Sequence, residues 1–386
     1  MNIVIAPDSF KGSISAIRAT HLITQGIQKV LPEVNCIKFP VADGGEGTVE
    51  AMVTANGGII KQQNVIGPLG KTIKASYGLL NNRVAVVEMA EASGLPLVSE
   101  NLKNPLITTT YGTGQLIKAA LDDGCSNIII GIGGSATNDG GVGMAQALGI
   151  SFKDAHGNEI GYGGGAIANL VSIDMSSLDP RIKNTNITVA CDVTNPLCGK
   201  EGASAVYGPQ KGATPKMVTQ LDANLKHLAN TVKTQLCVEM DNIKGGGAAG
   251  GLGAGLMVFC NATLKPGIDT VLDAINIDDH LKNAHLVITG EGKMDSQSMY
   301  GKVPVGIATR AKKYNIPVLA IVGSIGALSP TIYESGIDSI ISCVNAPMTL
   351  EEAIANTDEL LIQAAERAMR MIKMGTTIKK KGDVRL

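Results

Sequence analysis

The sequence lacks an excess of charge of either sign. Its 33 lysines and arginines almost balance its 34 aspartates and glutamates, so the formal net charge is −1. A chain without a strong net charge has no long-range electrostatic attraction to nucleic acid or to an anionic membrane surface. We therefore predict no nucleic-acid partner and no membrane partner, and we expect small anions to be bound by local groups.

Long apolar runs are missing as well. The first apolar run, residues 3–6, is short and follows no basic segment, which is not the pattern of a secretory signal. No other run approaches the roughly 20 apolar residues that a helix needs to cross a bilayer. We therefore expect a cytoplasmic protein.

The residue patterns of disulfide frameworks, structural zinc sites and serine hydrolases are also absent. Seven cysteines are an odd number without a CxxC pair, and the five histidines show neither HxxxH nor HExxH spacing. A GxSxG nucleophile elbow is not found either. The sequence thus favours buried, reduced thiols over disulfides or metal ligands, and it disfavours hydrolysis by a nucleophilic serine.

Glycine, in contrast, is abundant. The chain contains 47 glycines among 386 residues, while aromatic residues make up only 3%. An average protein has roughly 7% glycine. The excess indicates many turns in which the backbone closely approaches another group.

Strand-like and helix-like segments alternate at both ends of the chain. The predicted strands of these two regions are residues 2–6, 36–41, 285–290, 317–323 and 338–342, and the first two are followed by helices at 15–31 and 48–55. Right-handed crossovers would place the five strands in one doubly wound parallel sheet. Short β-rich runs around Asn81-Asn82 instead indicate a hairpin. We predict an α/β protein in which residues 1–62 and 268–386 form one domain, interrupted by a second α/β domain of residues 63–267.

A glycine-rich turn, GIGGSATNDGG at residues 131–141, follows an apolar strand-like run. Its first six residues fit the dinucleotide pattern GxGxx(G/A), but residues 161–166 and 245–250 fit it too, so the pattern carries little weight here. A dinucleotide fingerprint also normally opens the first βαβ unit, and that position holds APDSFKGS. The GPLGKT stretch at 67–72 would need a glycine at Val65 to be a Walker A loop, so we predict a hairpin turn there.

Acids, hydroxyls and lysines recur in glycine-rich turns at the ends of predicted strands. These turns are PDSFKGS at 7–13, ADGGEGT at 42–48, GGSATNDGG at 133–141, the segment 191–212, and TGEGKMDSQSMYGK at 289–302. Any one of them could serve only to cap a helix. Ligands of open α/β sheets, however, bind beyond the carboxyl ends of strands. Phosphoryl transfer needs these residue types, because amides and lysines bind phosphates, carboxylates hold Mg²⁺ and an acid can act as the base.

The polar turns belong to longer blocks, which are APDSFKGSISA, PVADGGEGTVEAM, IIIGIGGSATNDGGVGMAQALG, VACDVTNPLCGKEGASAVYGPQKGA, GGAAGGLGAGL and LVITGEGKMDSQSMYGKVPVGIA. In this order the blocks resemble the signature blocks of the bacterial class I glycerate kinases. The resemblance extends from Asn2 to about Ile372, and no block is missing. One departure is Lys293, where the family's block reads GEGR, since lysine lacks the planar fork with which arginine binds phosphate.

The resemblance implies an ATP-dependent kinase of D-glycerate that phosphorylates the 2-hydroxyl and yields 2-phosphoglycerate and ADP. It also implies a flavodoxin-like domain interrupted by a second α/β domain, with the active site in the cleft between them. The alternatives are 3-phosphoglycerate as the product, another small hydroxy acid as the substrate and, from a different class, a non-catalytic sensor of nucleotides or sugar acids. The glycine pattern leaves a dinucleotide-dependent oxidoreductase as a further alternative.

Chemistry and position suggest roles for the polar residues of these turns. Asp192, just after a predicted strand of the second domain, is our candidate for the general base. The carboxylates that could hold Mg²⁺ are Asp43, Asp295 and Asp139. The residues that could bind the substrate are Ser9, Lys11 and Asn195. The expected nucleotide contacts are Gly133, Gly134, Ser135 and Thr137, and the lysines that could offset charge as the γ-phosphoryl group leaves are Lys293 and Lys302.

Overall fold

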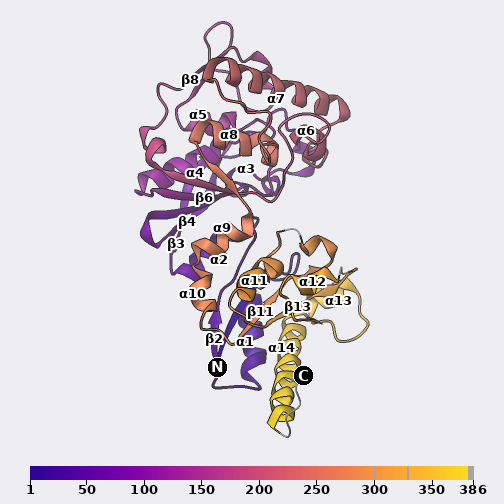
Figure 1. The fold of residues 1–386 in the computed structure, drawn as a ribbon. Coiled ribbons are helices and arrows are strands. Elements are labelled where there is room, and N and C mark those ends of the chain that lie inside the picture. Colours follow the sequence, from indigo (N-terminus) through magenta and orange to yellow (C-terminus); the bar gives the residue numbers. More distant parts are fainter. Residues whose placement is uncertain (300, 328–329, 381–386) are drawn as a thin grey trace. The chain divides into compact units, whose positions relative to one another are not determined.

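The computed structural model describes residues 1–299, 301–327 and 330–380 (Figure 1). Contacts between residues divide the chain into two compact units. Unit 1 contains residues 1–43 and the chain from Val271 onward, and unit 2 contains Gly44–Thr270. Unit 1 is therefore discontinuous in sequence, and unit 2 is inserted into it.

Unit 1 is built on a five-stranded sheet in which every neighbouring pair of strands is parallel. Its strands are β1 (Asn2–Pro7), β2 (Asn35–Lys38), β11 (Leu286–Gly290), β13 (Val318–Val322) and β15 (Ser339–Ser342), in the spatial order β15-β13-β11-β1-β2. Numbered along the chain, this order is 2-1-3-4-5, which is the flavodoxin-like order of a doubly wound sheet. The five strands predicted from the sequence thus form one parallel sheet.

Two helices from opposite ends of the chain cover the same face of this sheet. They are α1 (Ala16–Gln28) and α14 (Thr357–Lys380), which lie side by side in Figure 1 and share one apolar cluster with the strands. Gly26 allows this close packing, because a Cβ at that position would lie 2.3 Å from the carbonyl oxygen of Ile362. Helix α11 (Val303–Lys312) packs on β11, β1 and β13 without joining that cluster, which fits a place on the opposite face.

The remaining elements of unit 1 are short. A small parallel pair consists of β12 (Lys293–Met294) and β14 (Ser324–Ile325). The other helices are α9 (Gly267–Ala274), which begins in unit 2, α10 (Ile277–Leu281), α12 (Thr331–Glu334) and α13 (Leu350–Ala355).

Unit 2 contains a mixed six-stranded sheet in the order β10-β9-β6-β5-β4-β3. Strands β3 (Ile59–Ile66), β4 (Thr72–Leu80) and β5 (Val84–Glu88) pair antiparallel, whereas β5, β6 (Asn127–Gly131), β9 (Asn186–Ala190) and β10 (Thr263–Lys265) pair parallel. The hairpin turn predicted at residues 67–72 joins β3 to β4 and is closed by a 2.7 Å hydrogen bond from Gly67 N–H to Lys71 O.

Helices and a small hairpin complete unit 2. The longest helix, α7 (Pro215–Leu236), begins at Thr214, whose hydroxyl accepts a hydrogen bond from the N–H of Met217, as its sequence predicts. The others are α2 (Thr48–Asn56), α3 (Ala90–Ser93), α4 (Tyr111–Asp122), α5 (Val142–Ala147), α6 (Ala203–Tyr207) and α8 (Leu252–Cys260), and β7 (Ser151–Lys153) pairs with β8 (Ser172–Asp174). In the described chain, no helix combines the length and the apolar character that crossing a membrane requires.

Helix α2 lies in a different unit from the one that its sequence neighbours suggested. It follows β2 along the chain, but it packs on β4 and β5 of unit 2. Gly78 in β4 makes room for it, because a Cβ there would lie 2.8 Å from Cγ2 of Val53. The structure therefore divides the chain at residues 43/44 and 270/271, where the sequence suggested 62/63 and 267/268.

Candidate active site

The parallel strands of unit 2 end at a common edge. Glu88 of β5 pairs in register with Gly131 of β6, Gly131 pairs with Ala190 of β9, and Ala190 pairs with Lys265 of β10. The loops that follow these strands therefore start side by side. In α/β proteins this carboxyl edge is where ligands bind.

The ADGGEGT turn packs directly against this edge. A Cβ on Gly131 would lie 2.4 Å from Gly44 O, and a Cβ on Gly44 would lie 2.7 Å from Cβ of Ala190. Gly44 also has a φ of 92°, a conformation that favours glycine. Close backbone contact between the two predicted glycine loops thus explains why both loops need glycine.

Glu88 anchors the same turn, and the sequence had suggested no role for this residue. Its side chain accepts hydrogen bonds from Val49 N–H at 2.7 Å and from Gly47 N–H at 3.3 Å, which are the free amides at the start of α2. Glu88 is only 7% exposed, and this burial raises the pKa of its carboxyl to about 7, although the two hydrogen bonds oppose the rise. The available signal was an acid near the end of the β-rich run that follows Asn81-Asn82.

The loop after β6 exposes two predicted nucleotide contacts and buries the other two. Gly133 and Gly134 are exposed, and Gly134 has a φ of 71°. No acceptor in the described chain takes the N–H of either glycine. Ser135 and Thr137 are buried below them. The loop therefore offers backbone amides outward, the arrangement with which proteins bind phosphate.

A buried lysine supports this loop from below. Lys211 Nζ donates hydrogen bonds to Ser135 Oγ at 2.8 Å and to Thr137 O at 2.6 Å. Lys211 is 2% exposed, and burial lowers its pKa to about 7 while the negative charge of Asp139 opposes this change. The sequence placed Lys211 in a polar turn but did not connect it with Ser135, which is 76 residues away.

Asp139 is occupied by hydrogen bonds within the protein, which fits its expected role as a metal ligand poorly. Its carboxylate is 1% exposed and accepts hydrogen bonds from the N–H and hydroxyl groups of Thr110 at 2.8 and 2.9 Å. The N–H groups of Gly141 and Gly143 also donate to it, at 3.2 and 3.4 Å. Burial raises the pKa of Asp139, and these hydrogen bonds oppose the rise. Asp139 thus holds two segments of unit 2 together.

Asp192 and Asn195 follow β9. Asp192 is exposed, and its Oδ1 accepts a 2.8 Å hydrogen bond from the N–H of Gly267, which follows β10. Asn195 instead binds within its own segment, because its amide accepts from the hydroxyl of Tyr207 at 2.7 Å and donates to Glu201 O at 2.8 Å. Of these two residues, Asp192 therefore presents an exposed acidic side chain at the carboxyl edge.

In unit 1, acidic side chains gather where β1 and β11 end. Pro7 pairs with Gly290, and Asp8 N–H donates to Gly290 O at 2.8 Å. Burial, with the negative charges of Asp43 and Glu291 adding to it, raises the pKa of Asp8 to about 7. The N–H of Ser9 donates to Asp8 Oδ1 at 2.6 Å. The predicted residues Ser9 and Asp43 thus lie around Asp8, to which the sequence had suggested no role.

Two ion pairs occupy the segment after β11. Lys302 Nζ lies 3.1 Å from Oε2 of Glu291, and Lys293 Nζ lies 3.1 Å from Oδ2 of Asp295. Glu291 is 4% exposed, and its Oε1 has no hydrogen-bond partner within the described residues. Burial raises the pKa of Glu291, and a hydrogen bond with the Ser298 side chain and the positive charge of Lys302 oppose that rise. Lys11 is exposed.

The predicted site residues thus fall into two groups, one at the carboxyl edge of the unit 1 sheet and the other at the carboxyl ends of the parallel strands of unit 2. The group in unit 1 contains Ser9, Lys11, Asp43, Lys293, Asp295 and Lys302. The group in unit 2 contains Gly133, Gly134, Ser135, Thr137, Asp139, Asp192 and Asn195. Among the described residues, no three His, Cys, Asp or Glu side chains are arranged to hold a metal ion by themselves.

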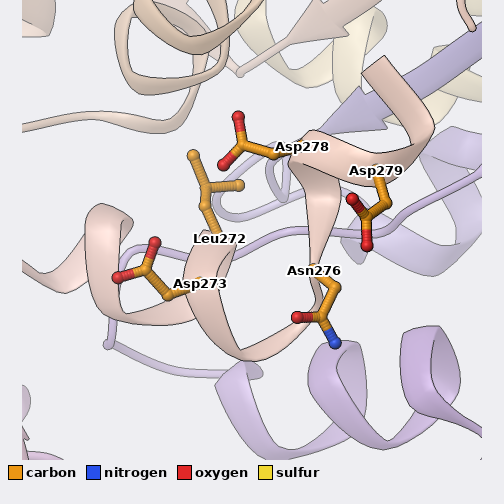
Figure 2. Close-up of a pocket in the computed structure, with 5 residues that line it drawn as sticks. All are labelled: Leu272, Asp273, Asn276, Asp278 and Asp279. Carbon is orange, nitrogen blue, oxygen red and sulfur yellow. The ribbon is translucent and has the colours of Figure 1, made fainter. Parts of the chain in front are cut away.

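A separate pocket of about 290 Å³ lies between α9 and α10 (Figure 2). It is lined by Leu272, Asp273, Asn276, Asp278 and Asp279. Arg310 of α11 pairs with Asp273 and with Asp278, each at 2.6 Å. None of the predicted site residues lines this pocket, and its acidic wall would repel anionic substrates. The carboxyl edges of the sheets are therefore the better candidates for the active site.

Comparisons with a family model, with known proteins and with a solved structure all indicate the same family. Residues 3–373 match the model of the glycerate kinase family. The chain is 53% identical to the glycerate kinase of Halalkalibacterium halodurans, over 94% of this chain and 96% of that protein. It is 50% identical to glycerate 2-kinase of Escherichia coli, over 97% of this chain and 99% of that protein. A crystal structure of glycerate kinase 2 from Salmonella typhimurium LT2 superposes with a TM-score of 0.89 at 50% identity, covering 97% of this chain and 99% of that one.

Proposed function

Because the chain belongs to the glycerate kinase family, we propose that it transfers the γ-phosphoryl group of ATP to D-glycerate. The observation that carries this proposal is the sequence identity of about one half, over almost the whole chain, to proteins named glycerate kinase. The polar loops at the carboxyl edges supply the groups that phosphoryl transfer needs. The product that we propose is 2-phosphoglycerate, because one of these relatives is named glycerate 2-kinase.

The loop of residues 131–137 is our candidate for binding the phosphates of ATP. Two observations support this assignment, namely the outward N–H groups of Gly133 and Gly134 and the hydroxyl of Ser135 next to them. Backbone amides in a glycine turn bind phosphate oxygens without a net charge of their own. Contact with the adjacent Gly44–Gly47 turn would hold the loop of residues 131–137 in place.

The acidic side chains of unit 1 fit Mg²⁺. The negative charges of Asp43 and Glu291 both raise the pKa of Asp8, and Glu291 Oε1 is buried without a partner in the described chain. Mg²⁺ is usually held by one or two carboxylates together with substrate phosphates, so these carboxylates need not form a complete site by themselves. We assign Asp43 and Asp8 as the carboxylates that would hold it, with Asp295 nearby in the same unit. When bound, Mg²⁺ would neutralise phosphate charge and align the γ-phosphoryl group.

Asp192 is the proposed general base. Its carboxylate would take the proton from the acceptor hydroxyl of glycerate while the oxygen attacks the γ-phosphorus. The hydrogen bond from Gly267 N–H fixes the orientation of this exposed carboxylate. Lys293 and Lys302 would stabilise the charge that moves onto the leaving phosphate. Ser9, Lys11 and Asn195 remain proposed substrate contacts.

The test is incubation of the protein with ATP, Mg²⁺ and D-glycerate, followed by ³¹P and ¹H NMR of the product. The proposal expects ADP formation that depends on D-glycerate, together with the proton spectrum of 2-phosphoglycerate. A reaction with L-glycerate in place of D-glycerate is the control for stereospecific recognition. The spectrum of 3-phosphoglycerate would correct the position of transfer, and ATP consumption that is independent of glycerate would refute the proposal.

A further inference from the structure

The ammonium group of Lys211 determines which way the hydroxyl of Ser135 can donate. An ammonium has three donors and no acceptor. Because Lys211 Nζ lies 2.8 Å from Ser135 Oγ, the oxygen of Ser135 accepts in this contact when Lys211 carries its proton. The hydroxyl proton of Ser135 then points away from Lys211. The contact from Lys211 is the one side-chain hydrogen bond that Ser135 makes within the described residues.

Lys211 itself is held in a rigid and closed environment. It ends a short 3₁₀ turn at Pro209–Lys211, and the N–H of Lys211 donates to Gly208 O at 3.0 Å. Gly212 follows with a φ of 90°, and a Cβ there would lie 2.5 Å from Lys103 O. At 2% exposure the ammonium cannot reach a ligand outside the loop. Any effect of Lys211 on a ligand must therefore pass through Ser135 or Thr137.

Other polar atoms of this loop also lack partners in the protein. Thr137 Oγ1 and Asn138 Oδ1 are buried and make no hydrogen bond to the described residues. Buried polar atoms without partners are rare in folded proteins and need a specific explanation. The protein thus leaves part of the hydrogen-bonding capacity of the loop unused, as a ligand site requires.

We propose that Lys211 is a positioning residue that turns the Ser135 hydroxyl outward as a hydrogen-bond donor to a phosphate group bound by residues 133–135. The proposal rests on the proposed function, because it takes this loop as the nucleotide phosphate site. The second hydrogen bond of Lys211, to Thr137 O, keeps the following residues in the same conformation.

The test compares Lys211→Met, Ser135→Ala and the double variant with Lys216→Met, which removes an exposed lysine five positions further along the chain. A lost hydrogen bond to a charged group predicts a rise of about tenfold in KM for ATP in both single variants. KM for D-glycerate should stay unchanged, as should both constants in Lys216→Met. Because Lys211 acts through Ser135, adding Lys211→Met to Ser135→Ala should raise KM for ATP little further.

A direct binding measurement separates positioning from a general structural defect. Calorimetric titration with inorganic tripolyphosphate should show the same loss of affinity in Lys211→Met as ATP shows. Adenosine, which has no phosphate, should bind to Lys211→Met and to the native chain alike. Additive effects of the two substitutions, or an equal loss for adenosine and for tripolyphosphate, would overturn the proposal and leave Lys211 a purely structural role.

Ser135 variants keep the test decisive if Lys211→Met does not fold. Ser135→Thr retains the hydroxyl and should keep KM for ATP close to the native value, whereas Ser135→Ala should raise it. Equal KM values for ATP in Ser135→Ala and the native enzyme would refute this inference while leaving the kinase activity intact. Loss of the proposed function is distinguishable, because it would appear as a native chain that does not phosphorylate glycerate at all.

Discussion

Glu88 Oε1 accepts a 2.7 Å hydrogen bond from the N–H of Val49, and this contact joins the end of β5 to the first turn of α2. The residues are 39 positions apart in the sequence. The Gly44–Gly47 turn comes just before Val49 in the chain, and it packs on Gly131 and Ala190 at the carboxyl edge of the unit 2 sheet. One buried carboxylate therefore fixes the position of a loop that forms part of the candidate site.

Replacing Glu88 with glutamine should weaken the dependence of stability on pH. The folded chain holds the proton of Glu88 up to about pH 7, whereas an unperturbed glutamate releases it near 4.5. Between these values the folded state binds more protons, so Glu88 makes the free energy of unfolding fall as pH rises through this window. The full effect is on the order of 3 kcal/mol, since one pKa unit corresponds to about 1.4 kcal/mol.

Urea unfolding at pH 5 and pH 8 measures this difference. The native chain should lose more stability between the two pH values than Glu88→Gln does, because glutamine does not titrate. Asp8, whose pKa is also raised to about 7, contributes a similar slope that both proteins keep. Equal changes in the two proteins would show that Glu88 does not titrate in this range.

Asp192→Asn should abolish most of the activity while leaving the fold intact. Asparagine keeps an oxygen that can accept the hydrogen bond from Gly267 N–H, but it cannot take a proton from the acceptor hydroxyl. A decrease in kcat of at least about a hundredfold is expected for the loss of a general base. Asp222→Asn is the matched control, because Asp222 Oδ1 likewise accepts a 2.8 Å hydrogen bond from a backbone N–H, that of Gly199. Near-native turnover in Asp192→Asn would remove Asp192 from this role.

The fold of unit 1 could be read from the sequence because its signals are local. Each strand of its sheet is a short apolar run that ends in a glycine or polar turn, and strictly parallel order follows from the alternation with helices. The Thr349-Leu-Glu-Glu352 pattern likewise indicates a capping box, which is formed at the start of α13. The helix predicted at residues 48–55 is also formed, as α2, but its place in unit 2 was not predicted, since nothing in these residues indicates which sheet they cover.

The candidate site was predictable in its loops but not in the residues that support them. Gly133, Gly134 and Asp192 stand out because they follow strands directly. Glu88 and Lys211 act on loops 39 and 76 residues away, and such contacts leave no trace in local spacing. Asp139 is the opposite case, because its sequence position suggested a role that its contacts do not favour. An acid in a glycine-rich turn has the pattern of a metal ligand, but the fold places the N–H and hydroxyl donors of Thr110 next to its carboxylate.

Gly131→Ala should destabilise unit 2 through backbone crowding. The new Cβ would lie 2.4 Å from Gly44 O, so either β6 or the Gly44–Gly47 turn must shift. Overpacking of this kind costs about 1–3 kcal/mol. Gly161→Ala is the control, because a Cβ at that exposed glycine meets nothing within 4 Å. Urea unfolding should separate the two variants, and a native stability for Gly131→Ala would show that the turn is free to move away.

Asp43→Asn should increase the Mg²⁺ concentration that the kinase reaction requires. Asp43 is the carboxylate whose negative charge adds most, after burial, to the raised pKa of Asp8, so its neutralisation removes both a proposed ligand and the repulsion that a cation would relieve. An increase of about tenfold or more in the Mg²⁺ concentration for half-maximal rate is expected at saturating ATP. The pKa of Asp8 should fall in the same variant, which NMR titration of the Asp8 carboxyl can follow without any metal present. Asp358→Asn serves as the control, because Asp358 pairs with Arg18 on the surface of the same unit. An unchanged Mg²⁺ requirement together with a lowered pKa of Asp8 would confirm the electrostatic cluster and exclude Asp43 as a magnesium ligand.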